Sequence, residues 1–334
     1  MKRTIYDVAR EAGVAISTVS RVLNGSDEVS DATRERVLEA IERLQFRPQR
    51  TARTLAQQDT HTLAVALPSF TSLFYVELLK GVKDELRDRG IDLLLCNLGS
   101  TEPYQTLLRF LNRGAVDALM LVSLPVDEKL ERELEKLHAP VVLVGSQSET
   151  FDSIYWDDTA GAERAVLHLA EQGHERIGFI AAHTWSAVAE ARLEGYERGL
   201  ERSGLGFDPD LVVTGETEKH AGFSEEAGYE AMKKLMRLNA ITAVCASSDV
   251  QAYGAWSALR DAGREVPTDV ALIGYDNIKL SRYLGLSTVD QHMHTVGRQA
   301  TRRLLQRMAS PAEAVLTHSV TLDLIARRSS STPA

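Results

Sequence analysis

The stretch TIYDVAREAGVAISTVSRVLNG, residues 4–25, predicts two short amphipathic helices joined by a tight turn. The first helix has apolar side chains at the spacing of one helix face, at Ile5, Val8, Ala9 and Ala12. Thr4 followed by Asp7 resembles a capping box, and Gly13 is the residue type that commonly ends a helix. Residues 16–23 then resume the helix.

A third helix is expected after Ser30, a residue type that favours helix N-caps. Its apolar stripe is formed by Val37, Leu38, Ile41 and Leu44. Three short helices with a tight turn between the first two predict a helix-turn-helix unit.

The second helix has small, polar and basic residues where a DNA-reading helix needs them, at Ile16, Ser17, Ser20 and Arg21. Arg21 can bind guanine with two hydrogen bonds, Ser17 can donate or accept, and Ile16 can contact a thymine methyl group. Thr18 and Asn24 are expected to contact phosphates. The alternative is a helical hairpin with a solvated polar face, because this pattern alone also occurs in proteins that bind no DNA.

The charge distribution agrees with a small DNA-binding segment. The chain has 334 residues, is 44% hydrophobic and carries a formal net charge of −9. Residues 1–58 contain 10 Lys or Arg and 8 Asp or Glu, a net charge of +2, so the remainder carries −11. Only the N-terminal segment is therefore suited to a polyanion.

The bulk features favour a cytoplasmic protein with more than one domain. A single core rarely grows beyond about 250–300 residues. No apolar run approaches the roughly 18–20 residues of a membrane helix, and no apolar stretch follows the basic N-terminus as in a signal peptide. Cys96 and Cys245 lie in apolar runs and are expected to be buried thiols.

The region after the linker predicts two parallel sheets covered on both faces. Apolar strand-like runs alternate with helix-length stretches at 63–68, 91–96, 116–122 and 140–145, and again at 176–182, 211–216, 243–247 and 270–276. Such alternation is typical of doubly wound α/β domains. The predicted fold class is α/β, with an N-terminal all-α helix-turn-helix domain, a hinge helix and two doubly wound subdomains.

Open parallel sheets bind ligands at the carboxyl ends of their strands, and two such sheets can close on a small molecule. The residues at or near those ends are Ser69, Phe74, Tyr75, Ser123, Trp156 and Asp276. An aromatic face for C–H groups and polar side chains for vicinal hydroxyls are what a sugar site needs.

No catalytic motif accompanies these residues, so we expect no enzyme activity and no cofactor. Serine-hydrolase elbows, phosphate-binding loops and zinc motifs are missing from the sequence. His292 and His294 lack a carboxylate or Cys at ligand spacing, so no metal site is predicted.

The string from Thr4 to Gly25, followed by VSDATRERVLEAIERLQFRP and ARTLA, closely resembles the N-terminus of the LacI/GalR family of bacterial transcription regulators. Downstream, HLAEQGHERIGFIA, ARLEGYERGL, SSDVQAYGAWSALRDAG, VALIGYDN and LSTVDQ look like its regulatory domain. The resemblance implies a homodimer on a near-palindromic operator, with ARTLA as a hinge helix. It places Arg50, Arg53, Leu55 and Ala56 on DNA, with Leu55 wedged into the minor groove, and Thr4 among the contacts. Gln49 departs from the family's frequent Asn.

The resemblance also implies an effector site. Arg192 and Asp276 match residues that hold the effector, Trp156 and Phe223 flank it, and Gln291 ends the crossover strand beside it. Ser248 departs from a common Asn, which leaves its contact open. The alternatives are core packing for Trp156 and Phe223, a surface position for Arg192, and an N-cap role for Asp249.

The expected domains are 1–47 (helix-turn-helix), 48–60 (hinge), 61–157 plus 291–320, 158–290 plus 321–328, and a disordered tail at 329–334. The predicted function is a dimeric repressor of sugar-utilisation genes that a carbohydrate effector releases from DNA. A purine-responsive or effector-activated regulator is the alternative, and a sugar-binding or sugar-processing protein without DNA is a remote one.

Overall fold

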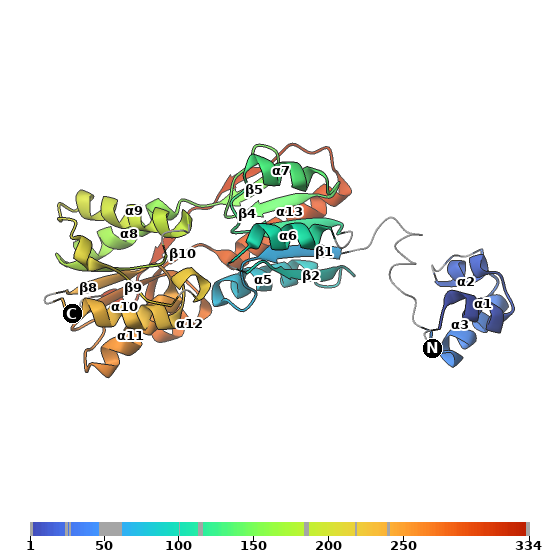
Figure 1. Cartoon of the computed structure of the whole chain (residues 1–334), viewed down its shortest axis with the longest axis horizontal. Helices are drawn as coiled ribbons and strands as arrows, with labels where there is room; N and C mark the ends of the chain where they lie inside the picture. Colours follow the sequence, from blue (N-terminus) through green and yellow to red (C-terminus); the bar gives the residue numbers. More distant parts are fainter. Residues whose placement is uncertain are drawn as a thin grey trace. The chain divides into compact units, whose positions relative to one another are not determined.

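The computed structural model describes residues 3–23, 26, 28–46, 62–99, 101–112, 116–183, 187–217, 219–238 and 241–331. The chain separates into two compact units, Met1–Thr60 and His61–Ala334 (Figure 1). No described helix is both long enough and apolar enough to span a bilayer.

The N-terminal unit contains the three predicted helices, α1 (Ile5–Ala12), α2 (Ile16–Leu23) and α3 (Asp31–Arg43). Its core is small and apolar, built from residues that include Val8, Val19, Val22, Val37 and Phe46. The capping box is present. Gly13 ends α1 with φ 63°, a conformation that costs glycine little, and Arg36 Nη2 donates to the carbonyl of Ala12 beside it.

One core assignment on α3 was wrong. Leu38 is 52% exposed, whereas Val37 and Ala40 are buried. The buried face of α3 runs through residues three and four positions apart, and Leu38 lies about 100° around the helix from Val37.

The second unit contains two six-stranded sheets, one in each of two lobes (Figure 1). The first has the order β11-β5-β4-β3-β1-β2. Its strands are β1 (Thr62–Leu67), β2 (Asp92–Asn97), β3 (Ala118–Val122), β4 (Val141–Val144), β5 (Asp152–Tyr155) and β11 (Thr317–Ser319). They pair in parallel, as predicted for a doubly wound sheet.

The first sheet is covered by a helix pair on each face. α5 (Leu73–Leu86) and α13 (Met293–Ala309) pack on one face, and α6 (Pro103–Leu111) and α7 (Glu128–Glu135) on the other. β2 is an edge strand, and its Leu93, Leu94 and Leu95 are 38%, 43% and 41% exposed.

The second sheet has the order β12-β10-β9-β8-β6-β7. Its strands are β6 (Ile177–Ala181), β7 (Val212–Thr214), β8 (Ala243–Ala246), β9 (Ala271–Asp276), β10 (Ser287–Asp290) and β12 (Asp323–Ile325). α8 (Asp158–Glu171) and α9 (Ala187–Arg202) cover one face, and α10 (Glu225–Leu235) and α11 (Asp249–Asp261) the other. A short α12 (Lys279–Leu284) follows β9, and β12 is antiparallel to β10.

The remaining short helices are η1 (Pro209–Leu211), η2 (Lys219–Gly222) and η3 (Arg328–Ser330). η3 corrects the expectation of a disordered tail from residue 329. Ser329 and Ser330 are fully buried, because Ser329 Oγ donates to the Leu272 carbonyl at 2.6 Å and Ser330 Oγ to Ser287 Oγ at 2.7 Å. Residues 332–334 lie outside the described part of the chain.

Candidate functional site

The predicted DNA-reading residues share one side of α2. Ile16, Ser17 and Arg21 are exposed, and Thr18 and Ser20 are partly exposed, while Val19 and Val22 hold the helix against the core. This arrangement presents short polar side chains and one guanidinium to solvent from a firmly packed helix.

Thr4 lies at the start of α1, where its backbone N–H and its Oγ1 each donate to Asp7 Oδ2 at 2.9 Å. These hydrogen bonds lower the pKa of Asp7. The other predicted contacts, Asn24, Arg50, Arg53, Leu55 and Ala56, lie outside the described residues.

The second candidate site is at the junction of the two lobes, where the carboxyl ends of the strands gather. Five residues form what we term the interlobe cluster: Trp156, Asp158, Arg192, Asp276 and Gln291. β5 leads to Trp156, α8 begins at Asp158, α9 carries Arg192, β9 ends at Asp276, and Gln291 follows β10.

Arg192 is at the centre of the cluster and is only 3% exposed. Its Nε donates to Asp158 Oδ1 at 2.9 Å, its Nη1 donates to the Ser247 carbonyl, and Nη1 lies 3.6 Å from Asp276 Oδ1. The guanidinium stacks on the Tyr275 ring at 3.7 Å and lies 5.8 Å from the Phe223 ring. Burial would lower the pKa of Arg192, but the charges around it, Asp158 first, outweigh burial and raise it.

The carboxylate of Asp276 is held by two partners. Besides Arg192, the Gln291 amide lies 3.0 Å from Asp276 Oδ1 and 2.7 Å from Trp156 Nε1, so its NH₂ faces the carboxylate and its oxygen faces the indole. Trp156 Nε1 also lies 3.0 Å from Asp158 Oδ2. Burial raises the pKa of Asp276 well above its usual range, and Arg192 offsets part of this effect. The cluster therefore combines an aromatic edge with buried groups that can hydrogen-bond hydroxyls.

The first lobe contributes side chains from the ends of β1 and β3 and from the start of α5. Tyr75 and Phe74 pack edge to face with ring centroids 5.0 Å apart. Burial raises the pKa of Tyr75 to about 12, its hydroxyl bonds Ser123, and the charges of Asp276 and Arg192 also act on it. Ser69 is buried, and its hydroxyl forms a hydrogen bond with the hydroxyl of Thr71, two residues away, at 3.0 Å.

Gly145 has φ 81°, and a Cβ there would lie 3.4 Å from the Trp156 ring and 3.5 Å from Ser123 Oγ. The backbone at the end of β4 therefore packs closely against the aromatic wall of the site.

Ser248 is not brought to the cluster by the contacts of its side chain. It is the N-cap of α11, where its hydroxyl accepts from the Gln251 N–H at 3.3 Å. The N-cap role expected for Asp249 was therefore wrong. Asp249 instead buries its carboxylate, which accepts from Thr288 Oγ1 at 2.6 Å, from the Ile278 N–H at 2.9 Å and from Ser281 Oγ.

Sequence reasoning missed Asp158 and Tyr275. Both adjoin predicted residues, Asp158 in the string WDD and Tyr275 in the string GYD. The paired acids after Trp156 were a usable signal, because the second acid of the pair enters the first turn of α8 while Asp157 caps it.

The two histidines in the string HMH bind different acids. His292 Nε2 lies 2.9 Å from Asp323 Oδ2 and its Nδ1 lies 3.4 Å from Asp290 Oδ2, whereas His294 Nε2 lies 2.9 Å from Asp84 Oδ2. They therefore tie separate elements together.

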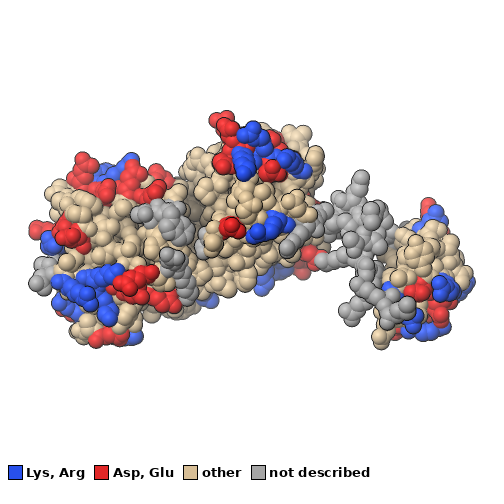
Figure 2. Space-filling model, in the orientation of Figure 1, with Lys and Arg blue, Asp and Glu red and all other residues tan. Residues whose placement is uncertain are grey.

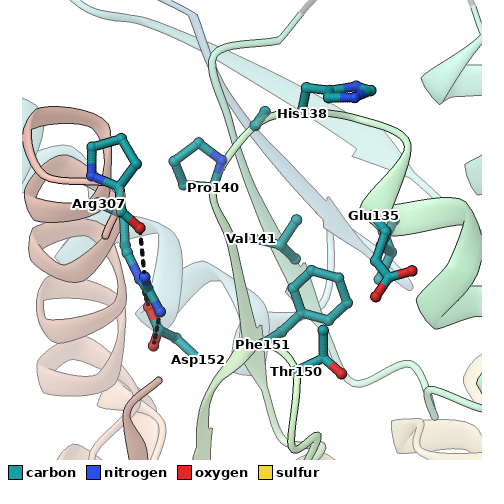
Figure 3. Close-up of a pocket in the computed structure, with 11 residues that line it drawn as sticks. Glu135, His138, Pro140, Val141, Thr150, Phe151, Asp152 and Arg307 are labelled. Atoms are coloured by element: carbon teal, nitrogen blue, oxygen red, sulfur yellow. Dashed lines mark hydrogen bonds and ion pairs between the residues drawn. The ribbon is translucent and has the colours of Figure 1, made fainter. Parts of the chain in front are cut away.

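A cavity of about 310 Å³ lies away from the interlobe cluster, beside the start of β4 and β5 (Figure 3). One of its polar lining residues is Arg307, whose Nε donates to Asp152 at 2.9 Å and whose Nη1 donates to the Pro311 carbonyl at 3.0 Å. The Arg307 guanidinium is held by these structural bonds, and Glu135, His138 and Thr150 supply the remaining polar lining.

Comparisons with known proteins match both parts of the chain. The family described as bacterial regulatory proteins, lacI family, matches residues 4–49, and a periplasmic binding protein-like domain matches residues 166–330. Catabolite control protein A of Priestia megaterium is 36% identical over 315 residues, which cover 92% of this chain and 93% of that protein.

Two solved structures extend the likeness to the fold. A transcriptional regulator CelR-cellobiose complex is 32% identical with a TM-score of 0.69, covering 98% of this chain and 100% of that one. The lac repressor dimer bound to operator and the anti-inducer ONPF is 26% identical with a TM-score of 0.78, covering 99% and 100%. The chain therefore belongs to the LacI family of bacterial regulatory proteins, whose members bind DNA and regulate transcription.

Proposed function

We propose that the chain is a dimeric repressor that binds a two-fold-symmetric operator through α2 and is released when a sugar binds at the interlobe cluster. The observation that carries this proposal is the buried cluster itself. A single arginine and two carboxylates converge with Trp156 at the junction of lobes that can close on a ligand.

The chemistry of the cluster favours an uncharged, hydroxyl-rich ligand. Arg192 is balanced by Asp158 and Asp276, so the cluster has no surplus positive charge for a phosphate. Carboxylates and an amide bind vicinal hydroxyls, and the Trp156 ring can lie against sugar C–H groups. The solved CelR relative is a complex with cellobiose, which supports a carbohydrate ligand.

The exposed leucines of β2 support a dimer. Leu73 on α5 and Leu280 and Tyr283 on α12 are also exposed, at 41%, 44% and 71%. Lys279 N lies 3.4 Å from Glu77 Oε1, so α12 lies beside α5. These exposed apolar side chains are candidates for an interface, and a second copy of the chain is the occupant that the proposed two-fold operator requires.

The effector acts through linkage. A sugar that closes the lobes changes operator affinity only by its difference in affinity for the two states. The direction of the change in operator affinity on adding ligand separates the proposal from its alternative. A repressor that sugar releases loses operator affinity, and an effector-activated regulator gains it.

Four measurements test the proposal, two on the unaltered protein and two on variants. Selection from a randomised duplex pool should recover a two-fold-symmetric site; recovery of no site would refute the DNA-binding role. Thermal-shift screening of monosaccharides, disaccharides, nucleobases and sugar phosphates should yield an uncharged sugar, because a ligand of the folded state raises its melting temperature. Stabilisation by a purine nucleobase instead would contradict the sugar effector and favour the purine-responsive alternative.

The matched variant is Asp276→Asn. It should keep operator affinity and lose the sugar response, since the side chain stays isosteric while a hydrogen-bond acceptor is lost. A response equal to the unaltered protein's would exclude the interlobe cluster as the effector site. For the dimer, Leu94→Asp should halve the mass measured by light scattering, and a change at the partly exposed Glu133, Glu133→Gln, should not.

A further inference from the structure

Arg21, the proposed base-reading arginine of α2, faces a glutamate in the described N-terminal unit. Arg21 Nε lies 3.6 Å from Glu28 Oε2, and the two side chains are 56% and 74% exposed. Figure 2 shows acidic side chains lying among the basic ones on the visible face of this unit. The question is why an acid lies beside a group that must bind DNA.

The backbone around Glu28 is held by bonds on both sides. The Ser26 N–H donates to the Arg21 carbonyl at 3.0 Å, and Arg34 Nη2 donates to the Ser26 carbonyl at 2.6 Å. The Glu28 N–H donates to Ser26 Oγ at 3.3 Å, and the next residue, Val29, is buried in the core. The loop therefore returns Glu28 to the last turn of α2 by contacts that do not involve its carboxylate.

We propose that Glu28 is a positioning residue that increases the sequence specificity of Arg21; this inference rests on the proposed reading of DNA by α2. A carboxylate beside Nε leaves the two terminal amino groups of the guanidinium free. These amino groups can donate to O6 and N7 of guanine. The Glu28 carboxylate therefore favours the orientation of the guanidinium in which its two terminal amino groups face the base.

The same carboxylate penalises binding without a guanine. An exposed ion pair contributes only about 0–1 kcal/mol to the stability of the fold. Arg21 and Glu28 can therefore change partners when DNA binds without a large loss of folding stability. When no guanine lies opposite, Arg21 can gain only a phosphate contact. That contact competes with Glu28, whose own charge the phosphates repel. The pair therefore weakens non-specific binding more than specific binding.

The test compares Glu28→Gln with Glu35→Gln. Both remove one negative charge from the N-terminal unit isosterically, and Glu35 is exposed on α3. Binding is measured by fluorescence anisotropy on the best duplex selected by the unaltered protein and on a shuffled duplex of the same composition, at several salt concentrations.

We expect Glu28→Gln to lower the ratio of specific to non-specific affinity about two- to fivefold, the range of an exposed ion pair. The salt slope on the shuffled duplex should steepen by about 0.9, as one more phosphate contact forms. Glu35→Gln should leave the ratio unchanged. Equal effects of the two variants would overturn the proposal, because a general charge effect would then explain them.

A double-mutant cycle isolates the role of Arg21. In an Arg21→Ala background, Glu28→Gln should no longer change the ratio; an undiminished effect there would also overturn the proposal. Unfolding temperatures of all variants should agree with that of the unaltered protein, which excludes a loss of folding. If Arg21→Ala itself leaves specificity intact, the proposed reading by α2 has failed, whereas an intact Arg21 effect without coupling to Glu28 refutes this inference alone.

Discussion

Replacing Asp152 by Asn should destabilise the first lobe by breaking a buried ionic junction. Asp152 is 1% exposed and receives Arg303 Nε at 2.8 Å and Arg307 Nε at 2.9 Å, both from α13 (Figure 3 shows the Arg307 pair). The Leu316 N–H also donates to its Oδ1 at 2.6 Å, just before β11. One carboxylate thus joins β5, α13 and the segment that starts β11.

The expected loss follows from what each arginine retains. Removing one partner of a buried ion pair costs about 3–5 kcal/mol, because a charge is left buried and unpaired. Here Arg303 keeps Glu313 and the Ala314 carbonyl, and Arg307 keeps the Pro311 and Glu313 carbonyls. We therefore expect the lower end, about 3 kcal/mol in the free energy of unfolding. That loss corresponds to a fall of about 6–12 °C in the melting temperature of a domain of this size.

The control variant removes a different carboxylate, that of Glu313, which pairs with Arg303. Glu313 is 43% exposed, so Glu313→Gln should cost less than about 1 kcal/mol. Differential scanning calorimetry and urea unfolding of the full chain measure both variants. The reasoning from burial would be refuted if the two variants lost equal amounts of unfolding free energy. It would also be refuted if Asp152→Asn lost less than about 1 kcal/mol, the value typical of an exposed ion pair.

The same junction sets a pH dependence. Burial alone would raise the pKa of Asp152, but the hydrogen bonds from Arg307, Arg303 and the Leu316 N–H together outweigh it and lower the pKa. A carboxyl with a lowered folded pKa stabilises the protein above its unfolded pKa of about 3.9 and loses that contribution as the pH falls. The difference in stability between the unaltered protein and Asp152→Asn should therefore narrow below about pH 4.

Three further changes are predicted. Gly297→Ala places a Cβ 2.2 Å from the Leu78 carbonyl oxygen, so α13 and α5 must separate, and calorimetry should show a loss of about 1–3 kcal/mol. Gly13→Ala forces alanine to φ 63° beside Arg36 and should cost about 1–2 kcal/mol, measured by chemical unfolding of the N-terminal unit in the full chain. Burial raises the pKa of Asp249 to about 7 against the hydrogen bonds of Ser281 and Thr288. A raised carboxyl pKa means that stability falls as the pH rises from about 4 to about 7, and Asp249→Asn should reduce this slope in pH-dependent unfolding, while the raised pKa of Asp276 maintains the rest of it.

The sequence predicted the three N-terminal helices and the strands β1 to β4 and β6 to β9, because their apolar patterns are local, whereas none of the predicted runs covers the inner strands β5 and β10. The apolar run at 116–122 becomes β3, all of whose residues are buried, and the run at 140–145 becomes β4. The short edge strand β11 has only exposed residues, and β12 is partly exposed, so neither has an apolar run to reveal it. They exist because neighbouring strands offer backbone partners, which local composition does not encode.

The buried tail shows the same limit for polar segments. The string RRSSS has the composition of a disordered end, yet Ser329 accepts from the Ser287 N–H at 2.8 Å and Arg327 Nη2 donates to Asn277 at 2.7 Å. Small hydroxyls can be fully buried when another part of the chain supplies their partners. Composition reports the cost of burying these groups but gives no sign of the partners that offset it.

The residues of the candidate site also fall into two groups, those that could be expected from the sequence and those that could not. Because the carboxyl ends of parallel strands gather at one edge of a sheet, the sequence pattern placed Trp156 and Asp276 among the candidates, whereas Gln291 was expected there from the family resemblance. Which acid neutralises Arg192 is a different matter, because Asp158 lies 34 positions away and meets it only where α8 packs against α9. That packing depends on close approach at Gly195, where a Cβ would lie 2.2 Å from the Thr159 carbonyl oxygen. The place of a candidate residue at a strand end can therefore be predicted from the sequence pattern, whereas the charge that neutralises it depends on a helix contact that only the folded chain reveals.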